Sequence, residues 1–534
     1  MISCLYHCRD FLVEMRKPPS ILLVTFADVA SYGVRCVASY ARQQGFQADI
    51  LCLRLSDTRK SRIDQKPGGI ISRELLAEMI PFMEQYDVIG ISLFSDGFNE
   101  SIALTQALKR SYPDKKVIWG SIHPTLRPHE CLQYADFVCV GEGYYSLVGF
   151  LKQLSKDRMP DDNGLPSGIW TRRPDGTIRE NGSSDMCMDM DTLPFPVYNQ
   201  TGNFVRANNN KIIHLDREGY KKYHDYVYYT MMSQGCPNHC SYCCNYALKK
   251  INKVYGHIRN HSVDYIIREI KDAAEHYTFY NVHFMDDCFL LTDADAFEEF
   301  VERYPKEIGL PFIVMGFIPS FTRQNHVDKL VAAGMVRGRI GVQTGSRKML
   351  DFYNRKQTNE EVIHVSEMFA RHKGRIVPMC VDLILDGYQE TAEDTIQTAR
   401  LISQMKRPFI LTLMSLKSYP GTRIEQYMNN YTPGDSYVIV NPTVINNIIG
   451  LMCLIKIPSG LLSFLLDKKQ LMSCKMPKIT TKLIYYGILL KRTLCYLDQR
   501  DYNYIPTWTV DIVRTLRRER RKPLLNNNQK THER

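Results

Sequence analysis

The chain has 534 residues, of which 44% are hydrophobic and 23% are charged, and its formal net charge is +11. This length exceeds one ordinary domain, so about two to four domains are expected. The composition is ordinary for a soluble globular protein, and 16 cysteines scattered along so long a chain do not form the disulfide framework of a small secreted protein.

The first ten residues, Met1–Asp10, lack the basic start and sustained apolar core of a secretory signal. Because the cysteines are also spread rather than clustered in a short chain, a reducing compartment is favoured. We therefore expect a cytoplasmic protein.

Short apolar runs alternate with helical patterns between residues 20 and about 155. The predicted strands are Ile21–Thr25, Ile50–Leu53, Val88–Ser92, Val117–Trp119 and Phe137–Val140, and the predicted helices include Val34–Gln44 and Asn99–Ser111. This alternation predicts an α/β domain with a parallel, doubly wound, flavodoxin-like sheet. We assign residues 1–155 to it.

Glycines and polar residues gather where these strands end. The candidate ligand-binding residues are Asp28, Gly33, Ser92, Gly120, His123, Gly141, Glu142 and Gly143. Ligands of such sheets bind at the carboxyl ends of the strands, and glycine there lets the backbone approach a ligand closely. A flavodoxin-like domain that has no cofactor is the alternative, because a fold alone does not imply a function.

A linker is predicted over residues 156–222. The stretch Gly168–Ile178 predicts a β-hairpin with Asp175 and Gly176 in its turn. The stretch Asp191–Tyr198 is expected to be extended, because proline disfavours a helix before it.

Three cysteines then follow an apolar run with the spacing C-x3-C-x2-C, at Cys236, Cys240 and Cys243. Three thiolates on one loop can bind three irons of a [4Fe–4S] cube and leave the fourth iron open. Structural zinc sites use four protein ligands. A zinc site completed by His239 or Cys244 is one alternative, and ordinary buried thiols are the other.

Strand–helix alternation resumes from Tyr226 and predicts a second α/β domain over residues 223–425. Its predicted strands are Tyr226–Met232, Asn281–Met285, Pro311–Gly316, Arg339–Val342, Ile376–Leu385 and Phe409–Leu413. Six such units make an open, partial (βα)6 barrel with its active residues on the carboxyl-end loops. Ser262 is expected to cap the helix Val263–His276, with Glu269 and Lys271 on its solvent face.

The cysteine spacing resembles that of the radical S-adenosylmethionine (SAM) superfamily. The resemblance implies that the open iron binds the amino and carboxylate groups of SAM, and that an electron from the cluster cleaves SAM to a 5′-deoxyadenosyl radical. It also implies SAM contacts from Tyr242, Asp286, Gln343, Arg355 and Asp382. Of these residues, Gln343 stands where many members have glutamate, which keeps hydrogen bonding and removes a charge.

Two of these assignments have plain alternatives. Asp286 and Asp287 together suit hydroxyls or the SAM amino group, but they also suit a helix cap or a surface loop. Arg355 can pair with the SAM carboxylate in bidentate fashion, but it also fits a surface position.

The first domain resembles the cobalamin (vitamin B12)-binding domain, whose usual signature is D-x-H-x-x-G, then S-x-L, then G-G. Asp28–Gly33, Ser92 and Gly141–Gly143 carry the resemblance, but Ala30 stands where the cobalt-ligating histidine would be. This departure resembles the B12-dependent radical SAM proteins, many of which bind cobalamin without a protein histidine on the metal. His123 lies in a suitable loop, although a buried, hydrogen-bonded histidine is the usual state of such a residue.

Residues 426–534 are predicted to be helical from patterns such as Leu483–Leu490 and Val510–Leu516. In similar proteins a C-terminal helical region closes over the substrate. The apolar stretch Ile439–Leu466 is interrupted by prolines and polar residues, so it predicts packed helices, with peripheral membrane contact as the weaker alternative. The basic run Arg514–Lys522 fits a solvated helix face, and it could also meet nucleic acid or anionic lipid.

The combined resemblance, over about residues 20 to 425, implies an enzyme that methylates an unactivated carbon of a biosynthetic intermediate. A radical SAM oxidative cyclase or ring-rearranging enzyme is one alternative, and a non-catalytic cobalamin or iron–sulfur sensor is another. The implied partners are a small-molecule substrate and an electron donor such as flavodoxin or ferredoxin. We expect no nucleic-acid partner, because no RNA-binding module is recognisable.

Overall fold

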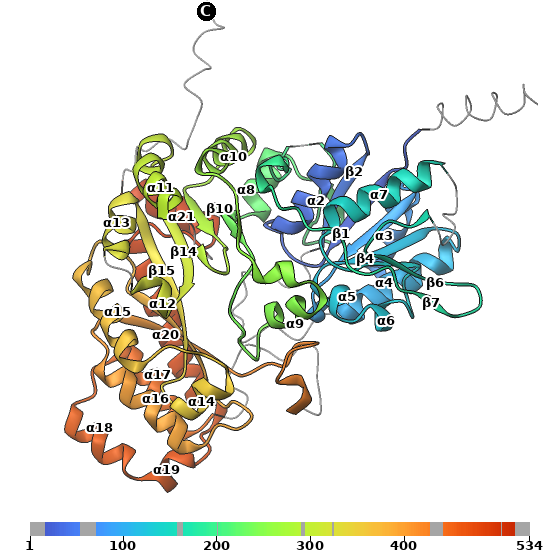
Figure 1. Ribbon diagram of the computed structural model, residues 1–534. Helices are drawn as coiled ribbons and strands as arrows, with labels where there is room; N and C mark the ends of the chain where they lie inside the picture. Colours follow the sequence, from blue (N-terminus) through green and yellow to red (C-terminus); the bar gives the residue numbers. More distant parts are fainter. Residues whose placement is uncertain are drawn as a thin grey trace, which may run out of the picture. The chain divides into compact units, whose positions relative to one another are not determined.

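The computed structural model describes residues 17–53, 71–156, 164–199, 201–289, 294–322, 325–427, 442–503 and 505–517. The described chain forms two compact units. Of the described residues, unit 1 takes those up to 224 together with 247–254, and unit 2 takes 225–246 and those from 255 onward. Figure 1 shows both units, each of which is described by itself below.

Unit 1 contains a doubly wound parallel sheet, as the sequence predicted. Its parallel strands are β1 (Ile21–Thr25), β2 (Ala48–Cys52), β3 (Val88–Ser92), β4 (Lys116–Gly120) and β5 (Phe137–Cys139), in the order β5-β4-β3-β1-β2. Its helices are α2 (Tyr32–Gln43), α3 (Arg73–Glu84), α4 (Phe98–Ser111), α5 (Ile122–Leu126), α6 (Pro128–Cys131) and α7 (Gly143–Lys156), with a 3-10 turn η1 (Ser95–Gly97). The strand order reverses between β1 and β3, which is where ligands of such sheets bind.

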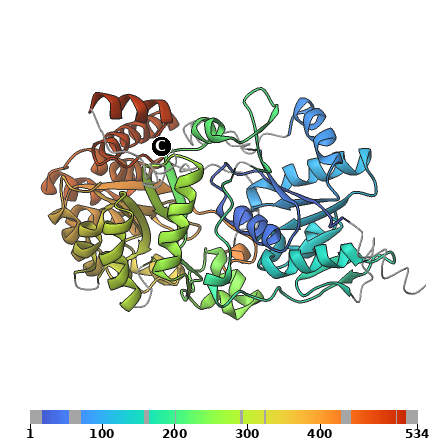
Figure 2. The same cartoon turned by 90° about the horizontal axis from the view of Figure 1, so that it is seen from above.

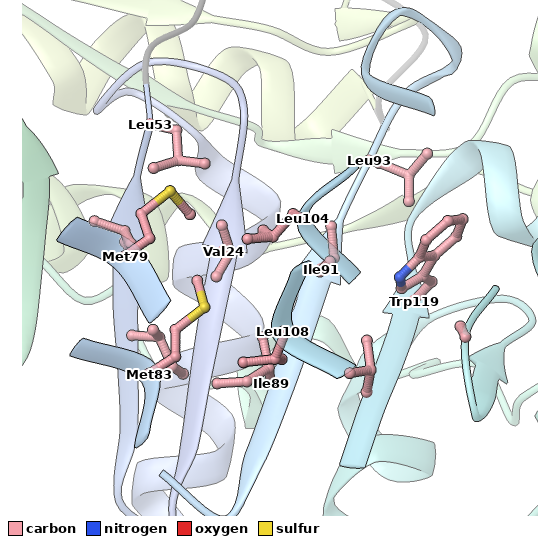
Figure 3. Packing of buried hydrophobic residues seen from close by; sticks show 14 of the residues in the cluster. Val24, Leu53, Met79, Met83, Ile89, Ile91, Leu93, Leu104, Leu108 and Trp119 are labelled. Atoms are coloured by element: carbon pink, nitrogen blue, oxygen red, sulfur yellow. The ribbon is translucent and has the colours of Figure 1, made fainter. Parts of the chain in front are cut away.

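The strands of unit 1 are apolar on both faces because helices cover both faces. All five residues of β1 are buried, for example. Figure 3 shows one face, where side chains of α3 and α4 lie over the strands; the labelled residues include Met79, Met83, Leu104, Leu108, Val24, Ile89, Ile91 and Trp119. The indole Nε1 of Trp119 donates to Thr105 Oγ1 over 3.1 Å, so this buried polar atom is satisfied.

The residues predicted as a linker extend the same sheet to nine strands. They form β6 (Ile169–Arg172), β7 (Ile178–Arg179), β8 (Asn203–Arg206) and β9 (Ile212–His214), followed by α8 (Arg217–Tyr223). The predicted hairpin is confirmed: β6 and β7 pair antiparallel, and Gly176 in the turn has a φ of 86°. The stretch predicted as extended starts instead with the 3-10 turn η3 (Met190–Thr192), because a proline restricts only the residue directly before it.

Arg35 of α2 ties the linker to the rest of unit 1. Its side chain is completely buried, and its guanidinium donates to the carbonyl oxygens of Val29 and Val197, the latter over 2.6 Å. The guanidinium also lies 4.3 Å from the ring centroid of Tyr198 and 5.7 Å from that of Tyr220. A buried cation is therefore stabilised by linker carbonyl and aromatic groups.

Unit 2 contains the predicted open barrel of six parallel strands. They are β10 (Val227–Thr230), β13 (Asn281–Phe284), β14 (Phe312–Phe317), β15 (Met335–Gln343), β16 (Met379–Ile384) and β17 (Phe409–Met414), paired in this order. The helices between them are α10 (Val263–His276), α11 (Ala294–Glu307), α12 (Ile318–Phe321), α13 (His326–Ala333), α14 (Arg347–Phe352), α15 (Asn359–Arg371) and α16 (Ala392–Gln404). Figure 2 shows this unit from above.

A two-stranded sheet of β11 (Ser233–Gln234) and β12 (Arg259–Asn260) follows β10. The helix α9 (Cys244–Ile251) and the 3-10 turn η4 (Lys253–Gly256) lie between these two strands in the sequence. The cysteine loop runs from β11 to α9.

Helix α10 begins as predicted, because Ser262 Oγ accepts from Tyr265 N over 3.1 Å. The prediction that Glu269 faces solvent is wrong: this residue is completely buried. Its Oε1 accepts from the hydroxyls of Tyr228 and Thr230 of β10, over 2.5 and 2.6 Å. Burial raises the pKa of Glu269 to about 7, against these two hydrogen bonds. Lys271 is exposed as predicted.

The described C-terminal region is helical, as predicted. After the 3-10 turn η6 (Glu425–Tyr427) it forms α17 (Val444–Leu454), α18 (Ser459–Leu466), α19 (Lys469–Ser473), α20 (Lys478–Asp498) and α21 (Thr507–Leu516). Of the helices in the described ranges, none is both long and apolar enough to cross a bilayer.

The last of these residues close the amino end of the barrel. Asn281 at the start of β13 bonds the chain at Arg500 and Tyr502, each over 2.9 Å. Arg337 of β15 forms a buried ion pair with Asp501 at 3.1 Å. Residues 500–502 therefore pack at the amino end of the barrel, which is opposite the carboxyl-end loops. These residues do not close over a substrate at the carboxyl-end loops.

Candidate active site

The cysteine loop leaves the carboxyl end of β10, where the barrel geometry predicts active residues. Gly235 precedes it with a φ of 103°, and a Cβ at this position would lie 2.1 Å from the carbonyl oxygen of His257. Only glycine fits such a close approach. Cys236 and Cys240 are buried and Cys243 is half-buried.

Hydrogen bonds fasten this loop to the turn after α14. Ser241 donates from its N to Tyr353 O over 3.1 Å and from its Oγ to Phe352 O over 2.7 Å. Asn354, which has a φ of 53°, donates from Nδ2 to His239 O over 2.8 Å. The next residue along this turn is Arg355, which is thereby held beside the cysteines.

Arg355 bridges the cysteine loop and the end of β15. Its Nη1 lies 3.6 Å from Cys240 Sγ, and its Nη2 donates to Gly341 O over 2.6 Å and to Gln357 Oε1 over 2.9 Å. Burial by itself would lower the pKa of Arg355, but the ionisable groups of Tyr242 and Cys240 raise it overall. A permanent cation beside this sulfur suits the negative charge of a cluster held by thiolates.

A different donor faces the first cysteine. Asn238 Nδ2 lies 3.6 Å from Cys236 Sγ, and the thiol of Cys288 lies 3.4 Å from the same sulfur. The hydrogen bond that Cys288 donates lowers the pKa of Cys236 to about 6, although burial alone would raise it. The third cysteine differs, because a hydrogen bond with Cys244 and then burial raise the pKa of Cys243. Cys288 was missed in the sequence because it lies outside the motif, although it closely follows a strand end.

In the parts of the chain that the structure describes, no three His, Cys, Asp or Glu side chains converge so as to hold a single metal ion. An iron–sulfur cube has a different requirement, because each thiolate binds its own iron. Three thiols on one loop, with an arginine and an amide facing two of the sulfurs, fit such an anionic cluster.

Asp286 holds the chain at the end of β10. It is completely buried, and it accepts hydrogen bonds from Met232 N (3.1 Å), Ser233 N (2.5 Å) and Ser233 Oγ (2.6 Å). Burial raises the pKa of Asp286 to about 7 in spite of these donors. Its oxygens are occupied by the protein, whereas the neighbouring Asp287 is exposed.

Gln343, the last residue of β15, is buried and has a φ of 66°. The register between β15 and β16 shifts between Gly341 and Gln343. The Oε1 of Gln343 has no hydrogen-bond partner among the described residues. A non-glycine residue at positive φ with an unsatisfied buried acceptor is typical of a ligand site.

Asp382 of β16 lies beside Gly341 in the sheet register. Its two oxygens lie 3.0 and 2.8 Å from Arg339 Nε. Arg339 was not identified from the sequence, although its position two residues before Gly341 puts both on one face of β15. Asp382 is thus already paired with a protein cation.

Tyr242 packs in an apolar cluster near the carboxyl ends of β16 and β17. Its ring lies 5.4 Å from that of Tyr353 in an edge-on arrangement, and the cluster also contains Ile384 and Leu416. This apolar wall suits a flat ring such as adenine. The structure thus brings Tyr242, Cys240, Arg355 and Gly341 together.

In unit 1, the predicted cobalamin residues lie at the carboxyl ends of the parallel strands. Asp28 and Gly33 follow β1 and Ser92 ends β3, so they flank the point where the strand order reverses. Asp28 Oδ1 accepts from Ala30 N over 2.9 Å, which fixes this loop. Gly33 is exposed, and a Cβ built there would meet no atom within 4 Å.

The remaining residues of this group lie after β4 and β5. Gly120 ends β4, and Gly143 begins α7. Gly141 has a φ of 106°, and a Cβ there would lie 2.2 Å from Ser184 Oγ. Glu142 Oε2 accepts from Cys187 N over 3.3 Å. Gly141 and Glu142 thus both contact residues of the linker.

His123 is a core histidine with hydrogen-bonding and aromatic neighbours. Its Nδ1 lies 3.0 Å from Ser95 Oγ, its Nε2 lies 3.7 Å from a carboxylate oxygen of Glu130, and its ring centroid lies 4.7 Å from that of Phe98. Burial and then the charge of Arg127 lower the pKa of His123 to about 4. The ring is therefore neutral at physiological pH.

Comparison with known families and structures agrees with this geometry. The B12 binding domain family matches residues 20–151, and the radical SAM superfamily matches residues 230–402. Together the two matches cover more than half of the chain. This chain belongs to the B12-binding radical SAM proteins.

Relatives of this B12-binding radical SAM protein span most of its length. The uncharacterized methyltransferase PH0819 of Pyrococcus horikoshii is 23% identical over 418 residues, which are 76% of this chain and 83% of the relative. The structure of the cobalamin-dependent SAM radical enzyme OxsB with aqua-cobalamin and SAM bound is 14% identical, covers 94% of this chain and 80% of that chain, and has a TM-score of 0.58. The apo form of OxsB has a TM-score of 0.59.

The two domains settle the coarse function of this B12-binding radical SAM protein. It is a cobalamin-dependent radical SAM enzyme, and its cofactors are a [4Fe–4S] cluster, SAM and cobalamin, as its domains imply. Radical SAM enzymes in general act on small molecules and require an electron donor. The likeness to OxsB shows that the fold is shared.

Proposed function

We propose that this enzyme methylates an unactivated carbon of a small biosynthetic intermediate. The observation that carries the proposal is the bridge made by Arg355, which joins the cysteine loop to the glycine-containing end of β15. A B12-binding domain on the same chain and a relative named as a methyltransferase favour methyl transfer over other radical outcomes.

In this proposal Cys236, Cys240 and Cys243 hold the cluster. When bound, the cluster supplies the electron that cleaves SAM, and cobalamin supplies the methyl group. Arg355 balances the negative charge at Cys240 and keeps the loop against β15 through Gly341. The apolar neighbours of Tyr242 exclude water from the place where a reactive carbon radical would form.

The proposed SAM contacts have different roles. Gln343 offers its unpartnered Oε1 to a donor on SAM, and Tyr242 offers an apolar wall to the adenine. Arg355 is close enough to the cysteines to face the SAM carboxylate. Asp286 acts by holding the turn after β10, and Asp382 acts by orienting Arg339.

For cobalamin we propose the reversal point between β1 and β3, with Asp28, Gly33 and Ser92 at its rim. The residues after β4 and β5 shape the adjoining loops. His123 keeps these loops in place from the core through Ser95 and Phe98, while its Nε2 has no hydrogen-bond partner among the described residues.

The test starts from protein purified without oxygen and reconstituted with iron, sulfide and cobalamin. Cys240→Ala is expected to lose most of the iron and to form no 5′-deoxyadenosine, and Cys244→Ala, which changes the adjacent thiol outside the spacing, is expected to keep both. Equal iron content in the two variants would contradict the cluster assignment.

Product analysis with SAM carrying a labelled methyl group then separates the reactions. Methylation adds one labelled CH2 to the substrate, whereas oxidative cyclisation or ring rearrangement adds none. A sensor would form no 5′-deoxyadenosine with either flavodoxin or ferredoxin as electron donor. Candidate substrates are screened by this mass change.

A further inference from the structure

Helix α20 carries a continuous apolar stripe on its outer face. The stripe residues are Ile479, Leu483, Tyr486, Leu490 and Leu494, each exposed by 40% to 65%. Their spacings of four, three, four and four residues put them on one side of a helix. Soluble proteins rarely expose a contiguous apolar surface of this kind without a partner.

The opposite face of α20 already has its packing partners. A Cβ at Gly450 of α17 would lie 2.7 Å from Ile484, and a Cβ at Gly487 would lie 2.9 Å from Leu454 of α17. Lys491 donates to Phe409 O of β17 over 3.3 Å. The stripe therefore points away from the core of unit 2, and it is not needed to attach α20.

The chain around the stripe is strongly basic. Residues 455–498 contain eight Lys or Arg residues and two acidic residues, Asp467 and Asp498. Asp467 lies 3.7 Å from Arg400 of α16, and Asp498 lies 4.0 Å from Arg517, so each acidic residue has a basic partner other than the lysines beside the stripe. Lys475, Lys478 and Lys482 are exposed, and in the described part of the chain they have no carboxylate partner.

Two of these lysines repel each other. Lys478 and Lys482 are four residues apart on α20, a spacing at which like charges destabilise a helix. Lys482 is also four residues before Tyr486, so it borders the stripe. An anionic surface would relieve the repulsion while covering the apolar side chains.

We propose that the apolar stripe of α20, with Lys475, Lys478 and Lys482 beside it, docks on the surface of a membrane that contains anionic lipids. The arrangement is that of a helix lying in the bilayer interface, with apolar side chains in the acyl region and lysines at the headgroups. A second copy of this chain fits less well, because it would bring two equally basic surfaces together.

The experiment uses the full 534-residue chain and vesicle flotation. Binding is expected to vesicles of phosphatidylcholine with a quarter phosphatidylglycerol, and not to vesicles of phosphatidylcholine alone. The pair Lys478→Gln and Lys482→Gln is expected to weaken binding about 25-fold at low salt, from about fivefold per lysine near an anionic surface. The pair Leu483→Gln and Leu490→Gln is expected to weaken it at least about tenfold.

Matched controls come from unit 1. Met188→Gln removes another exposed apolar side chain, and the pair Lys221→Gln and Lys222→Gln removes two exposed lysines of α8. These variants are expected to bind within about twofold of the unchanged chain, since they lie outside the docking surface.

Three results would overturn the proposal. The first is equal binding to neutral vesicles, and the second is unchanged binding by either α20 variant pair. The third is a lipid-independent dimer of the unchanged chain that dissociates in the Leu483→Gln, Leu490→Gln variant, which would assign the stripe to a second copy. Thermal denaturation of each variant checks that the fold is retained.

Discussion

Replacing Asp501 with Asn is expected to loosen the C-terminal segment from the amino end of the barrel by about 3–5 kcal/mol, the usual cost of breaking a buried ion pair. Asp501 and Arg337 are exposed by 0% and 3%, and their charged atoms lie 3.1 Å apart. At an effective dielectric constant of about 20, this separation corresponds to about 5 kcal/mol of attraction. The substitution keeps an acceptor for Asn503 N and removes only the charge.

Removing one partner leaves the other charge buried, which is why the single variant is costly. Arg337 would keep its contact with the ring of Tyr496 at 4.4 Å, which compensates only in part. The double variant Arg337→Met, Asp501→Asn buries no unpaired charge. It is therefore expected to recover at least half of the loss.

Hydrogen exchange measured by mass spectrometry on peptides covering 496–503 reads this opening directly. A change of 3–5 kcal/mol corresponds to exchange that is about a hundredfold to several thousandfold faster. Arg347→Met, which breaks an exposed pair with Asp351, is the control and is expected to change exchange less than about threefold. The reasoning would be refuted if exchange in Asp501→Asn stayed within threefold of that in the unchanged chain. It would also be refuted if the free-energy loss of the double variant equalled the sum of the losses of the two single variants.

Three further predictions concern single residues. Glu269 has its pKa raised to about 7 by burial, so the folded chain binds this proton more tightly, and its contribution to stability is expected to fall by about 3 kcal/mol as pH rises from about 4.5 through 7. Glu269→Gln should lower the pH slope of stability in calorimetry by this contribution and leave the slope from Asp286, whose pKa burial also raises to about 7. Gly141→Ala should lower the thermal midpoint of unit 1 clearly more than Gly176→Ala, because both glycines have positive φ but only a Cβ at Gly141 meets Ser184. Equal shifts of the midpoint would count against the close approach of Gly141 to Ser184. Gln343→Leu should weaken SAM binding in equilibrium dialysis by about fivefold to a hundredfold, and Gln343→Glu should weaken it much less. If Gln343→Leu binds SAM as tightly as the unchanged chain, Gln343 is not part of the site.

Much of the architecture could be predicted because parallel strands covered on both faces are continuous apolar runs. Ile21–Thr25 and Val88–Ser92 were predicted with the bounds that the structure has, as was the helix Val263–His276. Strand β15 begins four residues before the predicted Arg339, because Arg337 is a buried charge that interrupts the apolar pattern. The existence of elements was thus easier to predict than their ends.

Contacts between distant residues could not be predicted from local patterns. The burial of Glu269 depends on two hydroxyls of β10, which a helical periodicity does not reveal. Asp286 has the expected position at a strand end, but its donors come from the end of another strand. Among the candidate site residues, Arg355 lies beside Cys240, and its contact with SAM stays a prediction, whereas the partner of Asp382 was missed.

The guanidinium of Arg35 has a practical consequence for dissecting this chain. A fragment cut after residue 155 would lose Val197, Tyr198 and Tyr220, and would leave a positive charge stranded inside its own interior. Such a fragment should aggregate, whereas one that runs on to His224 retains every one of these groups. Chimaeras that exchange the vitamin-binding half between homologues should be joined after His224 for the same reason.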